Sequence, residues 1–122
     1  MAQHILVIDD EAFVRQMLQT LLERAGYAVT LAASADQGLA IMRQTRPDLV
    51  TLDLMMPVRD GLDLLVEKQA DPVLRAIPCL VISAVGYRKD LERALEIGAR
   101  AALSKPFSQH QLLEAVERTL GG

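Results

Sequence analysis

Acidic, hydroxyl and basic side chains follow short apolar runs at four places in this 122-residue sequence. Asp9 and Asp10 come directly after one run, Asp53 after another, and Ser83 and Lys105 after two more. If these runs are parallel strands, their carboxyl ends meet at one edge of a sheet, with neighbouring strands about 4.8 Å apart. Three carboxylates packed this closely repel one another, and either protonation or a cation relieves the repulsion. At neutral pH we expect a divalent cation.

The candidate ligands in this cluster are all oxygen atoms. Oxygen ligands suit Mg²⁺, with Mn²⁺ also possible, and argue against zinc. His4 lies five residues before Asp9, which places it roughly 16 Å away along an extended strand. We therefore expect a solvated histidine at the opposite end of the strand, and we expect His110 at the surface. The sequence predicts a magnesium site without histidine ligands.

The elements that must position these residues alternate along the chain. Five short apolar or β-prone runs have the pattern of strands buried on both faces. Between them, apolar residues such as Phe13, Met17 and Leu21 recur at helical spacing. This alternation predicts an α/β fold with a doubly wound, five-stranded parallel sheet of order 2-1-3-4-5, as in flavodoxin-like proteins. The expected strands are 5–8, 28–32, 49–52, 78–82 and 101–103.

Local signals at the expected helix ends agree with this pattern. Ser34 with Gln37 and Ser108 with Gln111 have the spacing of capping boxes, in which the two side chains bond the free N–H groups of a helix start. Gly98 stands where a helix would end, because glycine enters the left-handed conformation without steric cost.

Composition narrows the class of protein. Hydrophobic residues make up 51% of the chain, enough for a packed core, while the apolar stretches fall short of the roughly 18 residues that a membrane-spanning helix needs. No signal peptide is apparent, and the single Cys79 lies in an apolar run typical of a buried, inert thiol. The net charge of −3 gives no basic footprint for nucleic acid. We expect a cytoplasmic protein that contacts neither membranes nor nucleic acid directly.

Five short motifs in order resemble the receiver domains of two-component response regulators, with their CheY-like fold. They are IDD at 8–10, LDLMMP at 52–57, DG at 60–61, SA at 83–84 and KPF at 105–107. Each motif alone is weak, but five in order at strand ends are specific, and the match runs essentially end to end. The resemblance implies a single receiver domain over residues 1–122, with no effector domain.

The resemblance also implies roles for the acidic residues. Asp53 would be the phospho-acceptor, taking a phosphoryl group from a sensor histidine kinase or a phosphotransfer protein. Asp10 and Asp53 would bind Mg²⁺ directly, Asp9 would bind it largely through water, and the backbone carbonyl of Met55 would be a further ligand. Such a protein is a regulator that assists its own phosphorylation and dephosphorylation and then signals to a downstream protein target. It is not an enzyme in the ordinary sense.

The remaining motif residues would act on the phosphoryl group. Lys105 would pair with one phosphoryl oxygen, and Ser83 would donate its hydroxyl to another. The family resemblance also implies a cis bond between Lys105 and Pro106. Two positions depart from the usual pattern: Ala102 replaces an aromatic residue that accompanies activation in many relatives, and Arg59 replaces an apolar residue before DG.

Three other functions fit parts of the pattern. A phosphohydrolase of the haloacid dehalogenase type needs paired acids two residues apart, for which Glu11 is a poor substitute, and it needs a cap domain. A flavodoxin-like carrier needs a hydroxyl- and glycine-rich phosphate loop where this chain has acids. A receiver-like module that binds partners without phosphorylation would have no use for the acid cluster, Ser83 and Lys105, which are costly to keep unpaired.

Overall fold

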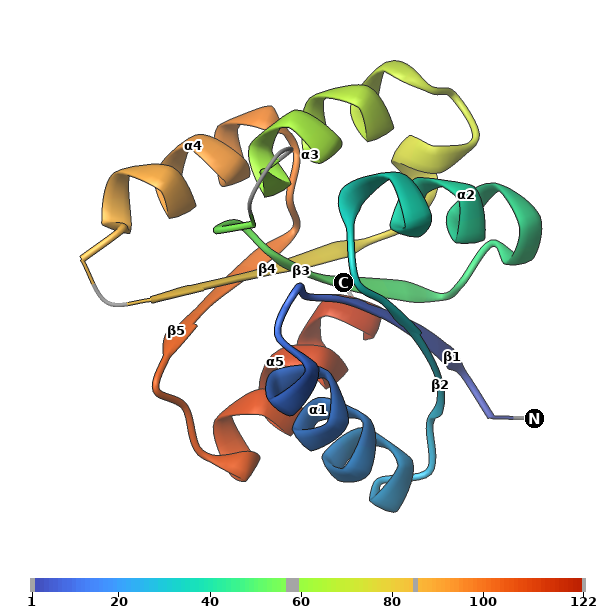
Figure 1. Cartoon of the computed structure of the whole chain (residues 1–122), viewed down its shortest axis with the longest axis vertical. Helices are drawn as coiled ribbons and strands as arrows, with labels where there is room; N and C mark the ends of the chain where they lie inside the picture. The colour runs from blue at the N-terminus through green and yellow to red at the C-terminus, as the bar shows by residue number, and fades with distance from the viewer. Residues whose placement is uncertain (1, 57–59, 85, 122) are drawn as a thin grey trace.

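The computed structural model describes residues 2–56, 60–84 and 86–121, in which strands and helices alternate along the chain (Figure 1). The strands are β1 His4–Ile8, β2 Ala28–Ala32, β3 Leu49–Asp53, β4 Cys79–Ala84 and β5 Ala101–Lys105. The helices are α1 Ala12–Arg24, α2 Ala35–Thr45, α3 Gly61–Ala70, α4 Arg88–Ile97 and α5 Gln109–Gly121, with a short 3₁₀ turn, η1, at Leu74–Ala76.

The strands form one parallel sheet in the order β2-β1-β3-β4-β5. Figure 1 shows α1 and α5 on one face of this sheet and α2, α3 and α4 on the other. The predicted fold class and strand order are confirmed. The order reverses between β1 and β3, and the carboxyl ends of these two neighbouring strands form the switch point of the sheet.

Three strands run further at their carboxyl ends than the sequence predicted. β3 includes Asp53, β4 continues through Ser83 to Ala84, and β5 continues to Lys105. The predicted ends at 52, 82 and 103 were wrong because they followed the apolar side chains, whereas the strand pairing is made by the backbone. The polar residues of the cluster are therefore held in the regular register of the sheet, with Ala84 opposite Lys105.

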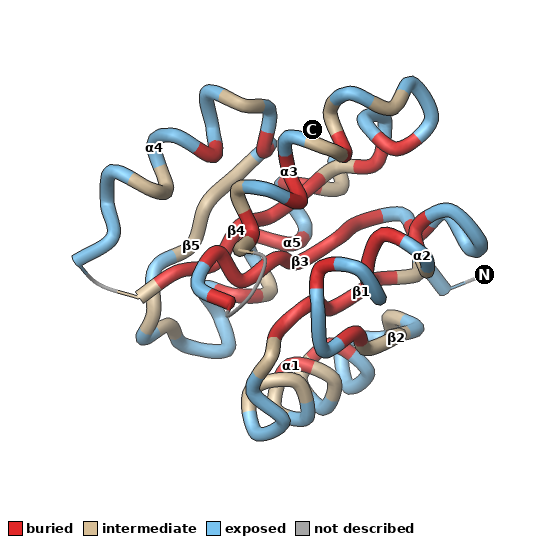
Figure 2. The backbone as a smooth tube through the Cα atoms, turned by 45° about the horizontal axis from the view of Figure 1, so that its top comes forward, coloured by how far each residue is buried: buried red, intermediate tan, exposed pale blue. Residues whose placement is uncertain are grey.

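The core has two layers, one on each face of the sheet. Along β1, Ile5 and Val7 pack into the layer beneath α1 and α5, while Leu6 and Ile8 pack into the layer on the other face. The burial colouring of Figure 2 shows that the central strands β1, β3 and β4 are almost entirely buried. Continuous apolar sequence in β1 is thus explained by burial on both sides.

The predicted helix caps are present. Ser108 N–H donates to Gln111 Oε1 at 2.8 Å, and Gln111 N–H donates to Ser108 Oγ at 3.0 Å, which completes a reciprocal capping box. Ser34 Oγ accepts from Gln37 N–H at 3.2 Å, but the Gln37 side chain accepts from Ala33 N–H and not from Ser34.

Gly98 ends α4 as predicted, with φ of 139° in the left-handed region. A Cβ at this position would also lie 2.2 Å from the Gln69 side chain of α3. The glycine therefore serves both the helix end and the close packing of α3 against it.

Cys79 is buried as predicted, and burial raises the pKa of its thiol to about 12. Among the described residues, no helix has both the length and the apolar character needed to cross a membrane.

One buried charge was not predicted. Lys68 on α3 is 1% exposed, and its Nζ donates to Gln69 Oε1 at 3.1 Å. Burial lowers the pKa of Lys68, and the neighbouring Arg100 lowers it further, against an opposing effect of Cys79. The pattern of α3 gave no sign of this because a lysine on an amphipathic helix is normally solvated.

We predict that Lys68→Met stabilises the protein. The substitution keeps the apolar stem and removes a buried amine, which should raise the free energy of unfolding at pH 7 by about 1 kcal/mol. Because the folded pKa of Lys68 is lowered, the unfolded chain binds more protons, so wild-type stability should rise as the pH increases toward 10 while the variant lacks this dependence.

Urea denaturation at pH 7 and pH 9.5 measures both effects. The control is Lys89→Met, which removes an exposed lysine on α4. A Lys68→Met variant less stable than wild type at pH 7 would show that the buried amine is a net stabilising group.

Candidate functional site

The predicted acids converge at the carboxyl ends of β1 and β3. Asp9 follows β1 and is 2% exposed, and Asp53 ends β3 and is 4% exposed. Carboxylate oxygens of Asp9, Asp10, Glu11 and Asp53 all lie within 4.8 Å of one another. The structure thus brings together the three predicted acids and adds Glu11, which the sequence had suggested only as a poor substitute for the second paired acid of a phosphohydrolase.

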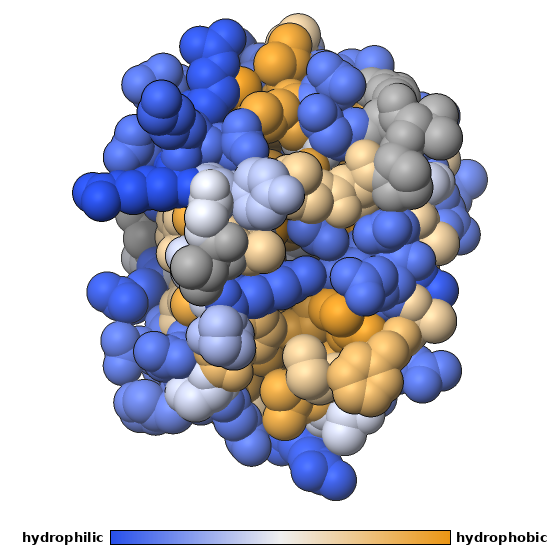
Figure 3. Space-filling view, turned by 60° about the vertical axis from the view of Figure 1, so that its left-hand side comes forward, coloured by the Kyte–Doolittle hydropathy of each residue, from blue (hydrophilic) through white to orange (hydrophobic). Residues whose placement is uncertain are grey.

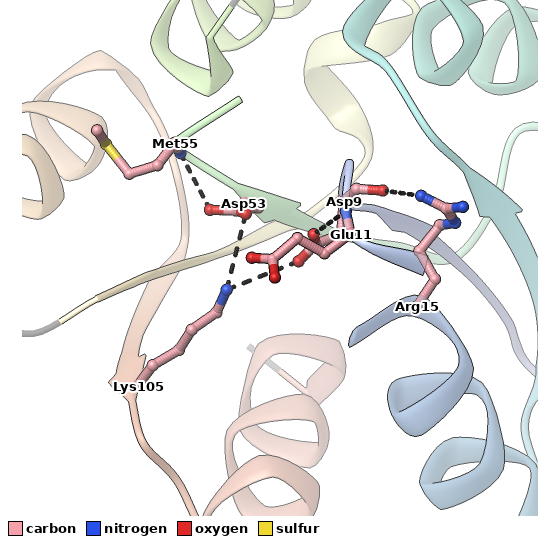
Figure 4. Close-up of polar contacts among 6 residues, drawn as sticks. All are labelled: Asp9, Glu11, Arg15, Asp53, Met55 and Lys105. Atoms are coloured by element: carbon pink, nitrogen blue, oxygen red, sulfur yellow. Dashed lines mark hydrogen bonds and ion pairs between the residues drawn. The ribbon is translucent and has the colours of Figure 1, made fainter. Parts of the chain in front are cut away.

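Asp9 is fixed by contacts to its side chain and its backbone. Glu11 N–H donates to Asp9 Oδ1 at 2.9 Å, and Asp9 N–H donates to the Ala32 carbonyl of β2 at 3.1 Å. Arg15 Nη1 donates to the backbone carbonyl of Asp9 at 2.8 Å (Figure 4). Arg15 therefore ties α1 to the segment that carries the acids, a role without a sequence signal because it acts on the main chain.

Asp53 is fixed from the segment that follows β3. Met55 N–H donates to Asp53 Oδ1 at 3.0 Å, and Gly61 N–H donates to the Leu54 carbonyl at 3.0 Å. A Cβ on Gly61 would lie 2.7 Å from the Asp53 carbonyl oxygen and 2.8 Å from Leu54 Cα. Only glycine lets the start of α3 approach the phospho-acceptor candidate this closely.

Lys105 reaches the acids from β5, across β4. Its Nζ lies 3.7 Å from Asp9 Oδ2 and 3.7 Å from Asp53 Oδ2, as Figure 4 shows. The bond from Lys105 to Pro106 is cis, as predicted. The lysine thus bridges the carboxylates of two neighbouring strands.

The positive charge of Lys105 only partly compensates the buried negative charges of Asp9 and Asp53. Burial raises the pKa of Asp9 to about 6, although the Glu11 amide and Lys105 lower it, and the charges of Asp53 and Asp10 add to the rise. Burial likewise raises the pKa of Asp53, against the lowering effects of the Met55 amide and Lys105. One lysine therefore does not offset the burial of two carboxylates beside a third acid.

Two polar atoms of the cluster have no partner among the residues that the structure describes. Asp10 Oδ1 and Ser83 Oγ are buried and make no hydrogen bond to any of these residues, and Ser83 is 0% exposed. A buried polar atom without a partner is costly, so both atoms fit a site that gains a partner on binding. A carboxylate oxygen accepts a cation, and a hydroxyl can donate to an anion.

Of the remaining residues that the sequence analysis discussed, the two histidines and Ala102 are not part of the acid cluster. His4 begins β1, at the far end from Asp9 as predicted, but it is not simply solvated: its Nε2 lies 2.6 Å from Thr30 Oγ1 on the adjacent β2. His110 is exposed, and its Nε2 lies 3.4 Å from Glu114 Oε2. Ala102 is half-buried and packs against the core, while Arg59 lies outside the described residues.

Comparisons with known proteins agree with this geometry. The family model of the response regulator receiver domain matches residues 5–117. The chain is 38% identical to chemotaxis protein CheY of Bacillus subtilis, over 98% of this chain and 99% of that protein. It is 37% identical to the phosphate regulon transcriptional regulatory protein PhoB of Pseudomonas aeruginosa, over 96% of this chain but only 52% of that longer protein.

Solved structures show the same relationship. Chemotaxis protein CheY4 of Vibrio cholerae superposes with a TM-score of 0.90 at 28% identity, over 98% of this chain and 99% of its own. A response regulator receiver domain protein of Clostridium thermocellum superposes with a TM-score of 0.89 at 31% identity, over 98% and 94%. The fold, the acids at the β1 and β3 ends and these matches agree, and the chain belongs to the response regulator receiver domain family.

Proposed function

We propose that residues 1–122 act as a single receiver domain, a phospho-acceptor switch of a two-component system in which Asp53 takes up a phosphoryl group. The observation that carries this proposal is the position of Lys105 Nζ, 3.7 Å from one carboxylate oxygen each of Asp9 and Asp53. A cation held over a buried aspartate at the switch point suits an anionic group bonded to that aspartate.

The phosphoryl donor is a phosphohistidine of a sensor histidine kinase or a phosphotransfer protein. Asp53 Oδ1 is held by the Met55 N–H, which leaves Oδ2 to attack phosphorus. As the O–P bond forms, the P–N bond breaks and its electron pair returns to the imidazole nitrogen. Lys105 then pairs with a phosphoryl oxygen, and the unpartnered Ser83 hydroxyl donates to another.

The acids suit Mg²⁺, with Mn²⁺ as a substitute. Asp10, Asp53 and the Met55 carbonyl would hold the ion directly, and Asp9 largely through water. Support comes from the buried, unpartnered Asp10 Oδ1, the raised pKa values of Asp9 and Asp53 and the all-oxygen donor set. When bound, the ion neutralises charge on the transferring phosphoryl group.

Protein partners fit the surface beside the site. Figure 3 shows hydrophobic side chains gathered over part of one face of the molecule. A shallow hollow next to Lys105 is lined by Val14, Met17, Pro106 and Phe107, and the nearby Phe13 of α1 is 77% exposed. An apolar surface bordering the site suits docking of the phosphoryl donor.

The downstream target is a second protein, and we place both contacts in the cytoplasm. The net charge of −3 disfavours direct binding to nucleic acid. Because Ala102 has no large ring to move, the signal would pass through shifts of loops and helices. A receiver-like module that works without phosphorylation is the alternative, and the next experiment separates the two.

We predict that wild-type protein gains one phosphoryl group from acetyl phosphate and Mg²⁺, seen as a single mass addition and a Phos-tag shift. Asp53→Ala should gain none, because the attacking carboxylate is absent. Asp63→Asn is the control, since it removes an exposed carboxylate on α3. Equal labelling of wild type and Asp53→Ala would refute Asp53 as the acceptor, and an unlabelled wild type would favour the phosphorylation-independent module.

We predict that Mg²⁺ raises the melting temperature of wild-type protein. A site with a dissociation constant near 1 mM would add about 1.4 kcal/mol at 10 mM Mg²⁺ by mass action. Asp10→Ala should abolish the shift because it removes the acid with the unpartnered buried oxygen. If the shift is the same in both proteins, the ion binds elsewhere.

A further inference from the structure

Glu11 occupies the mouth of the acid cluster. It is the N-cap residue of α1, with extended backbone angles, and its side chain makes no capping hydrogen bond. Its backbone N–H is bonded to Asp9 Oδ1, which anchors the residue beside the buried acids. In Figure 4 its carboxylate extends toward the space between Asp53 and Lys105.

Contacts among the described residues do not explain this orientation of the Glu11 side chain. Within the described residues, the Glu11 carboxylate makes no hydrogen bond or ion pair, although a free helix start lies directly beside it. Instead, one of its oxygens lies within 4.8 Å of ligand oxygens from Asp9, Asp10 and Asp53. A fourth negative group so close to three others is unfavourable unless a cation joins them.

A second observation points to a ligand at the same place. Asp10 Oδ1 is buried and has no hydrogen-bond partner among the described residues, and Asp9 and Asp53 are almost fully buried. Ligand oxygens of all four acids lie within 4.8 Å of one another, but Asp9 and Asp53 are buried whereas Glu11 is exposed at the rim. Mg²⁺ keeps several coordinated waters, and an exposed carboxylate at the rim can accept hydrogen bonds from them.

We propose that Glu11 is a fourth carboxylate of the cation site, one that holds the hydration shell of the ion and tightens its binding. The proposal rests on the proposed function, since it concerns the same site. Glu11 would be a positioning residue, because it acts through coordinated water and does not touch the phosphoryl group. Its long side chain also lets it stay in solvent while Asp9 and Asp53 are buried.

The test is a titration of wild-type and variant protein with Mn²⁺, in which electron paramagnetic resonance reports the free ion. Glu11→Gln keeps the shape and removes the charge. A charge about 5 Å from a divalent ion, partly screened by salt, should change affinity three- to tenfold. Glu11→Asp keeps the charge with a shorter reach, and it should bind with an affinity between those of wild type and Glu11→Gln.

The matched control is Glu23→Gln, which removes an exposed carboxylate from the last turn of the same helix. It should bind Mn²⁺ within twofold of wild type. Wild-type affinity in Glu11→Gln would overturn the inference, as would equal weakening in Glu23→Gln, and in both cases phosphorylation of wild-type Asp53 would leave the proposed function standing. If wild type itself neither binds Mn²⁺ nor accepts a phosphoryl group, both proposals fail together.

Discussion

Burial of the neighbouring carboxylates of Asp9 and Asp53 is the constraint around which the structure is organised. Asp9 directly follows β1, and Asp53 ends the adjacent parallel strand β3. Burial raises the pKa of both acids, so their charged forms are less favourable here than in solvent. Lys105 supplies one positive charge between them at 3.7 Å. One positive charge only partly compensates the two buried carboxylates, so the site favours binding of a cation together with an anionic group.

The surrounding fold keeps the acids in place despite the cost of burying their charges. The backbone amides of Glu11 and Met55 each hold one carboxylate oxygen, and Arg15 holds the main chain of Asp9. Gly61 allows α3 to pack directly on the Asp53 backbone. Beneath the site, the apolar layers on both faces of the sheet supply the stability that an unfavourable site requires.

The sequence was informative where polar residues interrupt an apolar pattern. Asp9, Asp53 and Lys105 could be placed together because each stands at the carboxyl end of an apolar run, and parallel strands end at the same edge. Lys68 could not be identified, since a lysine in an amphipathic helix looks the same whether it is solvated or buried. Arg15 gave no signal because its partner is a backbone carbonyl, whose position depends on the completed fold.

The most direct test of this account is the free energy of unfolding of Asp53→Asn against wild type, measured with EDTA and no divalent ion. If the cost of burying this carboxylate constrains the site, the variant should be more stable at pH 7.5, by about 1 kcal/mol or more. Because the folded pKa of Asp53 is raised, wild type binds more protons when folded, so the advantage of the variant should shrink as the pH falls. A variant that is less stable than wild type at pH 7.5 would contradict the account.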